Sequence, residues 1–354
     1  MNVARGAAAG WSQLAQRVPW VIVAILVACA VIASAGRDPV VALRALAVGA
    51  FGSPYGLASV GTKACPLILV GLAIMVAFRA GFWNIGAEGQ IVMGAIAAGA
   101  IGAHVSAPAG VHVVLVLLAA AVAGALWCGI AAWLRWRRGA LEVISTILLN
   151  FVALFVLSWL VHGPLMQASG AQPIGDPLAA TARIPRLLGA TLPLHAGVLF
   201  AVAMIAAVHW FLFRTETGFR LRVVGRNPDA ATWAGIHVPR TVWIAAATSG
   251  AIAGMAGAIE VMGVLGRLFD KVTPGYGFTG IAVAMLARLR PAAVLPSALL
   301  FAALETGSSR MQQEADVSHA LVLVIQGVVI LASIATGRGT PRREGRVWSS
   351  RKAS

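Results

Sequence analysis

Long apolar runs without a charged residue recur along this chain. A helix needs roughly 20 apolar residues to cross a bilayer about 30 Å thick, and six runs meet that need without any Asp, Glu, Lys or Arg. Four shorter or glycine-broken apolar runs are bounded by charge or by Pro and Gly, and we count them as spans as well. The pattern predicts an all-α polytopic membrane protein with about ten transmembrane helices, some of them interrupted. The predicted spans are 19–35, 64–78, 89–109, 111–134, 143–161, 196–213, 241–259, 277–287, 292–304 and 320–336.

The composition agrees with a membrane location. Of the 354 residues, 59% are apolar and 11% are charged, and the mean hydropathy is +0.86. Soluble domains are about 45–50% apolar and about 25% charged, so this chain lacks the polar surface that a water-soluble globule needs. No hydrophilic stretch exceeds about thirty residues, which is too short for an independent core. We therefore expect one transmembrane domain over 19–336, between a cytoplasmic N-terminal segment 1–18 and a basic cytoplasmic tail 337–354.

The charged residues predict the orientation. The chain carries 27 Lys and Arg residues against 12 acidic ones, a formal net charge of +15. Basic residues accumulate in the cytoplasmic loops of membrane proteins. With the N-terminus inside, 19 of the 27 fall on the cytoplasmic side, which favours both termini in the cytoplasm. Membrane topology thus accounts for the basic charge, and we expect no nucleic-acid partner.

Several kinds of chemistry have no motif in this sequence. No lysine follows a glycine, so a GxxxxGK[ST] phosphate loop is absent, and we expect a transport subunit rather than an enzyme, with no ATP site, cofactor or metal of its own. The GxGxxG match at 275–280 lies between membrane segments rather than in a βαβ unit, which favours a glycine-hinged entry into a short membrane helix. Cys29, Cys65 and Cys128 lie in apolar runs without CxxC spacing and predict neither disulfides nor a zinc site.

Three polar side chains interrupt the apolar pattern between two predicted spans. Asn84, Glu88 and Gln90 stand among glycines in the segment 81–90. Polar groups at membrane depth are costly unless they are buried in protein or face a water-filled cavity, and interrupted helices usually line the substrate route of transporters. One interpretation makes these residues part of the substrate path or gate. The other is a solvated cytoplasmic turn in which Asn84 caps the next helix.

A second interrupted region, 275–304, holds two short spans separated by the charged turn 288–291. Short, broken segments in both halves of a membrane chain indicate a midplane site between helices. Gly250 and Gly254 form a GxxxG motif and Gly257 follows one turn later, which predicts close helix packing. Acidic residues at predicted span ends are expected to be solvated at the membrane interface: Glu142, Glu260 and Glu305.

The longest predicted cytoplasmic loop, 214–240, contains the signals of a two-turn helix from about 228 to 234. Four residues supply the N-cap, the first helical position, a charge for the positive helix end and a left-handed termination, in that order: Asn227, Pro228, Asp229 and Gly235. Apolar residues expected to be exposed would form a knob suited to docking into a groove on a cytoplasmic partner: Ala230, Ala231, Trp233 and Ala234. The alternative is a helix lying on the lipid headgroups, with Trp233 at the interface.

Four stretches carry a family resemblance: FRAGFWNIGAEGQ at 78–90, LEVISTILLNFVA at 141–153, GFRLRVVGRNPDAATWAGI at 218–236 and GYGFTGIAVAMLARLRP at 275–291. They resemble the permease subunits of bacterial ABC importers, in the nucleoside and simple-sugar branch of the family that also contains branched-chain amino-acid and ribose permeases. Family members commonly have Gly-Arg-x-x-Pro where this chain has Ala287 before Arg288.

The resemblance implies a multi-pass, pore-forming subunit in the bacterial cytoplasmic (inner) membrane. Such a subunit pairs with a second permease, a paralogue, binds ATPase subunits that use ATP, and receives substrate from an extracytoplasmic binding protein. Asp229, Ala230, Ala231 and Gly235 resemble the coupling-helix pattern of importer permeases. The resemblance is closest to the nucleoside branch, so nucleosides are the leading substrate. No motif identifies a substrate residue, so a simple sugar such as a pentose stays open. An ion-coupled secondary transporter is disfavoured because the long spans carry no ionisable relay.

Overall fold

The computed structural model describes residues 23, 25–170, 172–318, 321–324 and 327–328. The chain divides into two compact units, 1–40 with 317–354, and 41–316. Every site described below lies in the second unit. The predicted segments 1–18 and 337–354 lie outside the described residues, as do parts of the predicted spans 19–35 and 320–336.

The described part of the chain is mostly helical, with one small antiparallel sheet in which β1 pairs with β2. The elements are α2 (Pro39–Phe51), α3 (Pro54–Arg79), α4 (Ala87–His104), α5 (Val111–Arg138), α6 (Glu142–Val161), β1 (Ile174–Pro177), a 3-10 turn (Ala180–Ala182), α7 (Gly197–Arg214), α8 (Glu216–Arg226), α9 (Pro228–Trp233), α10 (Val238–Glu260), a π turn (Val261–Leu265), β2 (Arg267–Phe269), α11 (Tyr276–Leu286) and α12 (Pro291–Ala315).

Among the described residues, six helices are long and apolar enough to cross a membrane, and a seventh span results if Ile25–Ser34 and α2 are counted together. The six are α3, α5, α6, α7, α10 with its π turn, and α12. Two of the predicted spans form helices, α4 and α11, that are not long or apolar enough to be counted with these six. The first turn of α4 carries Glu88 and Gln90, which lower its hydropathy, and α11 has only 11 residues.

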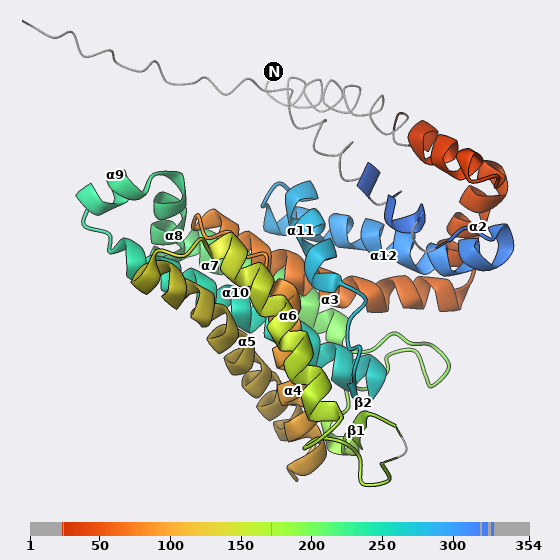
Figure 1. The fold of residues 1–354 in the computed structure, drawn as a ribbon, viewed down its shortest axis with the longest axis horizontal. Helices are drawn as coiled ribbons and strands as arrows, with labels where there is room; N and C mark the ends of the chain where they lie inside the picture. The colour runs from red at the N-terminus through yellow and green to blue at the C-terminus, as the bar shows by residue number, and fades with distance from the viewer. Residues whose placement is uncertain (1–22, 24, 171, 319–320, 325–326, 329–354) are drawn as a thin grey trace, which may run out of the picture. The chain divides into compact units, whose positions relative to one another are not determined.

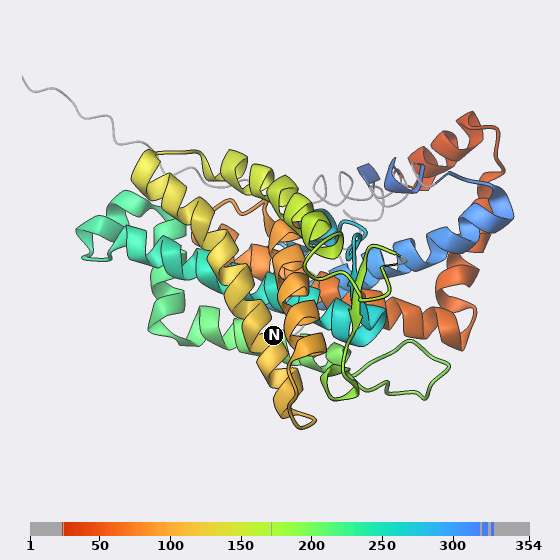
Figure 2. The ribbon, with the colours of Figure 1, turned by 60° about the horizontal axis from the view of Figure 1, so that its bottom comes forward.

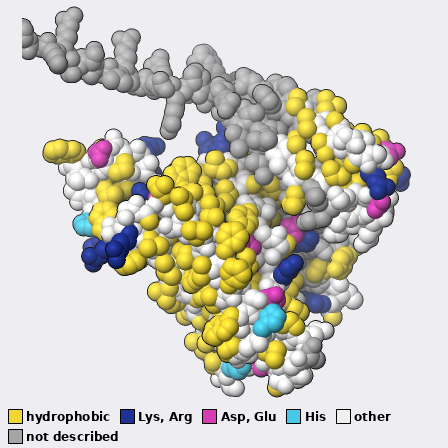
Figure 3. All heavy atoms as spheres, viewed as in Figure 1, with side chains coloured by type: hydrophobic (Ala, Val, Ile, Leu, Met, Phe, Trp, Pro, Cys, Tyr) yellow, Lys and Arg dark blue, Asp and Glu magenta, His cyan; other side chains and the backbone are white. Residues whose placement is uncertain are grey.

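The centre of the second unit is built around α3 and α10 (Figures 1 and 2). Of the apolar window of α3, 89% is buried, against 28% for α5 and α6 and 22% for α7, so α3 is an internal helix and the other three face outward. In Figure 3 hydrophobic side chains cover the middle of the face over α5 and α6, as expected for a surface that meets lipid.

Glycines let α10 approach α4 and α5 backbone to backbone. A Cβ atom added at Gly94 of α4 would lie 2.1 Å from the carbonyl oxygen of Gly254, and one at Gly124 of α5 would lie 2.1 Å from that of Gly250. Because no side chain fits in either place, the close packing predicted for the GxxxG motif is confirmed.

Candidate functional site

The break between α3 and α4 is held by buried side-chain hydrogen bonds. Asn84 and Gln90 are fully buried, and each amide nitrogen donates to the other's oxygen at 2.9 Å. The Asn84 amide also donates to Ser249 Oγ of α10 at 2.9 Å. The alternative of a solvated turn is therefore wrong for these residues, because their polar atoms are satisfied inside the protein.

A second set of bonds ties the break to α6. The Asn150 side chain accepts from the backbone N–H of Gly89 at 2.8 Å and donates to the carbonyl of Ile85 at 3.0 Å. The backbone N–H of Ile85 in turn donates to Thr146 Oγ1 at 3.2 Å. Sequence analysis did not single out Thr146 and Asn150, although two polar residues four apart in an apolar span are a detectable signal of a polar contact between helices.

Glu88 joins the two interrupted regions of the chain. Its Oε2 accepts from the backbone N–H of Gly277, in the first turn of α11, at 2.6 Å. The carboxylate thus lies at the positive end of α11, where negative charge is favourable. A Cβ at Gly277 would lie 2.3 Å from the Glu88 nitrogen, so glycine is needed for this approach. Glu88 itself is buried.

The turn between α11 and α12 is bound to the end of α3. Arg288 and Leu289 have φ values of 51° and 54°, a left-handed conformation that is unfavourable for residues with side chains. The Arg79 guanidinium donates two hydrogen bonds to the Leu289 carbonyl, at 2.9 and 2.6 Å. A Cβ at Gly225 of α8 would lie 2.0 Å from the Arg79 carbonyl oxygen. The end of α3 therefore contacts both the α11–α12 turn and α8.

The segment 214–240 folds into α8 and α9 rather than an open loop. Asn227 Oδ1 accepts from the Ala230 N–H at 3.0 Å and caps α9. Gly235 has a φ of +76°, and the N–H groups of Gly235 and Ile236 donate to carbonyls of the last turn, which is the Schellman arrangement. The predicted helix is present, with its last residue at Trp233.

The prediction of an exposed apolar knob on this helix is wrong for one of its four residues. Ala231 has no exposed surface and packs in a buried cluster with Phe82 and Val224. Trp233 is 92% exposed, and Ala230 and Ala234 are exposed as well. Because α9 packs on α8, one face of this short helix is buried, and only the opposite face can contact a partner.

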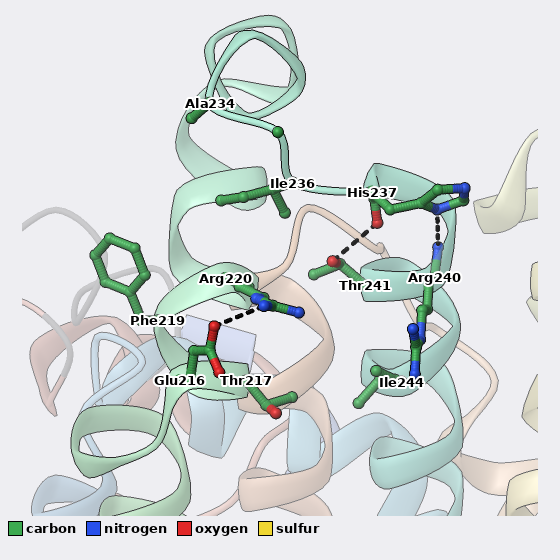
Figure 4. A pocket seen from close by; sticks show the side chains of 11 residues that line it. Glu216, Thr217, Phe219, Arg220, Ala234, Ile236, His237, Arg240, Thr241 and Ile244 are labelled. Carbon is green, nitrogen blue, oxygen red and sulfur yellow. Dashed lines mark hydrogen bonds and ion pairs between the residues drawn. The ribbon is translucent and has the colours of Figure 1, made fainter.

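A groove of about 420 Å³ lies between α8 and the start of α10, beside the end of α9 (Figure 4). Glu216 and Arg220 form an ion pair at 2.6 Å on its α8 side. On the α10 side, the Thr241 hydroxyl donates to the His237 carbonyl at 3.0 Å. We call this feature the α8–α10 groove.

Two acidic residues expected to be solvated are buried. Glu142 is 9% exposed and pairs with Arg135 at 2.8 Å, and Glu260 is 8% exposed. The expectation of interfacial solvation is wrong for both, because neighbouring helices cover the predicted span ends. Within the part of the chain that the structure describes, no group of three or more His, Cys, Asp or Glu residues could hold a metal ion.

Comparison with known proteins gives a consistent picture. The family model for the branched-chain amino acid transport system permease component matches residues 56–334. The glucose ABC transporter permease protein TsgB13 of Haloferax volcanii is 37% identical over 335 residues, 92% of this chain and 88% of that protein. The guanosine ABC transporter permease protein NupP of Bacillus subtilis is 36% identical, over 80% of this chain and 82% of that protein. A second guanosine permease of the same bacterium, NupQ, is 29% identical over 67% of this chain and 76% of that protein.

Proposed function

Since this chain belongs to the branched-chain amino acid transport system permease family and is a permease subunit of an ABC importer, we propose that it forms the translocation path for nucleosides. The observation that supports nucleosides as the substrate is the 36% identity of this chain to a guanosine permease over 80% of its length. The interrupted segments joined by the bond between Glu88 and Gly277 support a path between helices, because broken helices line substrate routes in other transporters.

A simple sugar is the second candidate substrate. It is favoured by the glucose permease TsgB13, which is similar over more of the chain than NupP. Nucleosides and sugars share a hydroxylated ring, so related permeases can differ in substrate without differing in architecture.

The proposed topology has about ten spans and both termini in the cytoplasm of a bacterial inner membrane. In this orientation α8, α9 and the α8–α10 groove face the cytoplasm, as do three basic residues at the end of α5. The six apolar helices and the family membership support a multi-pass protein.

The ATPase subunits are the proposed partners of α9. The exposed Trp233 and Ala230 offer a small apolar contact, while Asn227, Asp229 and Gly235 hold the helix in shape. The contact of Gly225 with Arg79, and of Arg79 with Leu289, then connects the docking helix to α11. ATP is bound and used by the ATPase subunits, not by this chain.

A second permease and an extracytoplasmic binding protein complete the proposed complex. Bacillus subtilis has two guanosine permeases similar to this chain, NupP and NupQ, and this supports a heterodimer of paralogues. Asn84, Glu88 and Gln90 are proposed to shape the gate, with Glu88 at the moving contact to α11 and the two amides as its fixed support.

Uptake measurements in a deletion strain test the substrate. Labelled guanosine uptake should fall and return when the gene is restored. Unchanged nucleoside uptake with lost uptake of a simple sugar would transfer the assignment to the second candidate, and unchanged uptake of both would refute the proposal.

A further inference from the structure

Two adjoining cavities lie where the second half of α5 packs against the first half of α10 (Figure 1). The first, which we call the apolar groove, has a volume of about 520 Å³ and is lined by apolar residues and one glycine, between 125 and 133 on α5 and at Trp243 and Ala247 on α10. The second, which we call the aromatic cavity, has a volume of about 510 Å³. Its lining residues are Trp133, Trp136, Arg137 and Trp243. The two cavities share Trp133 and Trp243, so each opens beside the other.

The walls of the apolar groove stand on two helices whose spacing is fixed by their backbones. A Cβ atom added at Gly124 of α5 would lie 2.1 Å from the carbonyl oxygen of Gly250 of α10. Nearer the end of α5, a Cβ at Gly129 would lie 3.2 Å from the Trp243 ring, so the absence of a side chain at Gly129 makes room for that ring. The groove is therefore a built feature of the α5–α10 packing.

The two cavities together have the length of one membrane leaflet. Ala125 and Arg137 are twelve residues apart on α5, which is about 18 Å along the helix axis. Half of a hydrocarbon core about 30 Å thick is about 15 Å. The apolar groove thus lies at the depth of the acyl chains, and the aromatic cavity lies at the interface, where Trp side chains are enriched. In the proposed orientation this is the cytoplasmic leaflet.

The aromatic cavity has a positive charge that no acidic residue of the described chain compensates. Three arginines end α5, and Arg135 among them pairs with Glu142 at 2.8 Å. Within the described residues, the Arg137 guanidinium has neither an ion pair nor a hydrogen bond, and the same part of the chain supplies no acceptor for the indole N–H groups that line the cavity. Arg137 and the indoles are exposed and therefore available to a ligand.

These features select an anionic amphiphile. A guanidinium binds phosphate oxygens through two parallel hydrogen bonds, and indole N–H groups can add further donors. An apolar helix of another protein would leave Arg137 without a partner at the contact, which is costly. A soluble anion would use the aromatic cavity and leave the apolar groove unused. Anionic lipids are also attracted to basic residues at the cytoplasmic surface of a membrane.

We propose that the apolar groove and the aromatic cavity bind one anionic glycerophospholipid of the cytoplasmic leaflet. Its phosphate lies at Arg137 and the indole N–H groups, and one acyl chain lies in the apolar groove. The inference goes beyond the proposed function and takes from it only the orientation in the membrane. Because α10 follows the docking helix α9 in the chain, a lipid bound to both α5 and α10 stabilises the part of α10 that is nearest to α9.

The test measures lipid binding to the complete transporter, purified in detergent and stripped of lipid, by native mass spectrometry at an ionic strength of about 0.15 M. Dioleoylphosphatidylglycerol is the probe. Dioleoylphosphatidylcholine has the same chains without net charge, and glycerol 3-phosphate has the phosphate without chains. The variants are Arg137→Gln, which removes the charge, and Ala125→Phe, which fills the apolar groove. Arg138→Gln is the matched control, because it removes the same charge one residue further on and lines neither cavity.

We expect the unmodified transporter to bind phosphatidylglycerol about fivefold more tightly than phosphatidylcholine. Arg137→Gln should weaken phosphatidylglycerol binding about tenfold, as for the loss of a hydrogen bond to a charged group. Arg138→Gln should weaken it no more than about twofold, since salt screens its attraction. Ala125→Phe should weaken the binding of both lipids severalfold, and glycerol 3-phosphate should not displace either.

Equal losses in Arg137→Gln and Arg138→Gln would overturn the inference, because they would show a general attraction to a basic surface. Unchanged affinity in Ala125→Phe would overturn it as well, since the chain would then lie elsewhere. Displacement by glycerol 3-phosphate would replace the lipid with a soluble anion. Failure of the unmodified transporter to bind the probe would favour the second permease as the cover of the groove. If Ala125→Phe does not assemble, the comparison of Arg137→Gln with Arg138→Gln decides, and none of these outcomes depends on which substrate is transported.

Discussion

Trp233 is the residue through which the proposed docking of α9 on the ATPase can be tested most directly. Its side chain is 92% exposed at the end of a capped helix, so replacing it by alanine removes no internal contact of consequence. An enclosed Trp side chain buries about 150–250 Å². At about 25 cal/mol per Å², complete burial against the ATPase would contribute roughly 4–6 kcal/mol, an upper bound for this contact.

Ordering costs reduce that value, and a central interface residue typically contributes about 2 kcal/mol or more. We therefore expect Trp233→Ala to weaken association with the ATPase at least about 30-fold. The assay titrates purified ATPase against the detergent-solubilised permease pair and follows both binding and stimulated ATP hydrolysis.

Trp159→Ala is the matched control, because Trp159 is 65% exposed on α6, far along the chain from α8 and α9, where lipid is the expected neighbour. Association of Trp233→Ala with the strength of the unmodified protein would refute docking through this helix. The Trp side chain would then be better explained as a contact with lipid headgroups.

Four further predictions follow, three from buried groups and one from the missing phosphate loop. Ala231→Asp should open α9 by burying a carboxylate without a partner, at a cost of several kcal/mol; limited proteolysis would then cut the α8–α9 segment in an otherwise inserted protein, and protection equal to that of the unmodified chain would contradict this. Glu88→Ala should reduce uptake without preventing insertion, because it removes the carboxylate bond to Gly277; normal uptake would remove Glu88 from the gate. Burial, followed by the charge of Arg186, lowers the pKa of His195 from 6.5 to about 4. As the pH falls, His195 is therefore protonated in the unfolded chain before it is protonated in the folded protein. The stability that His195 contributes above pH 6.5 should be lost as the pH falls towards 4. In detergent, the drop in thermal stability between pH 7.5 and pH 5 should be smaller in His195→Gln than in the unmodified protein, and an equal drop would contradict this role of His195. The purified chain should not hydrolyse ATP, and hydrolysis that persists after removal of all other subunits would contradict the missing phosphate loop.

The lengths of the apolar segments and the capping of α9 could be predicted from the sequence. Crossing a bilayer depends on the apolarity of each segment by itself, so the outward-facing helices α5, α6 and α7 agree closely with predicted spans. The boundaries of α9 follow from Asn227 and Gly235, whose bonds stay within one turn of the helix. The close packing of α10 was also predictable, because a GxxxG motif leaves a surface without side chains.

Only the tertiary structure decided which polar groups meet. Glu88 and Gly277 are 189 residues apart in the chain, and no local rule pairs them. Ala231 and Ala230 are equivalent in sequence, yet only Ala231 is buried, because α8 supports one face of α9. Glu260 stands at a predicted span end, where solvation is the ordinary outcome, yet the packing of the helices around it leaves it only 8% exposed. Burial and charge pairing are properties of the space between helices, whereas hydropathy and capping are properties of the chain itself.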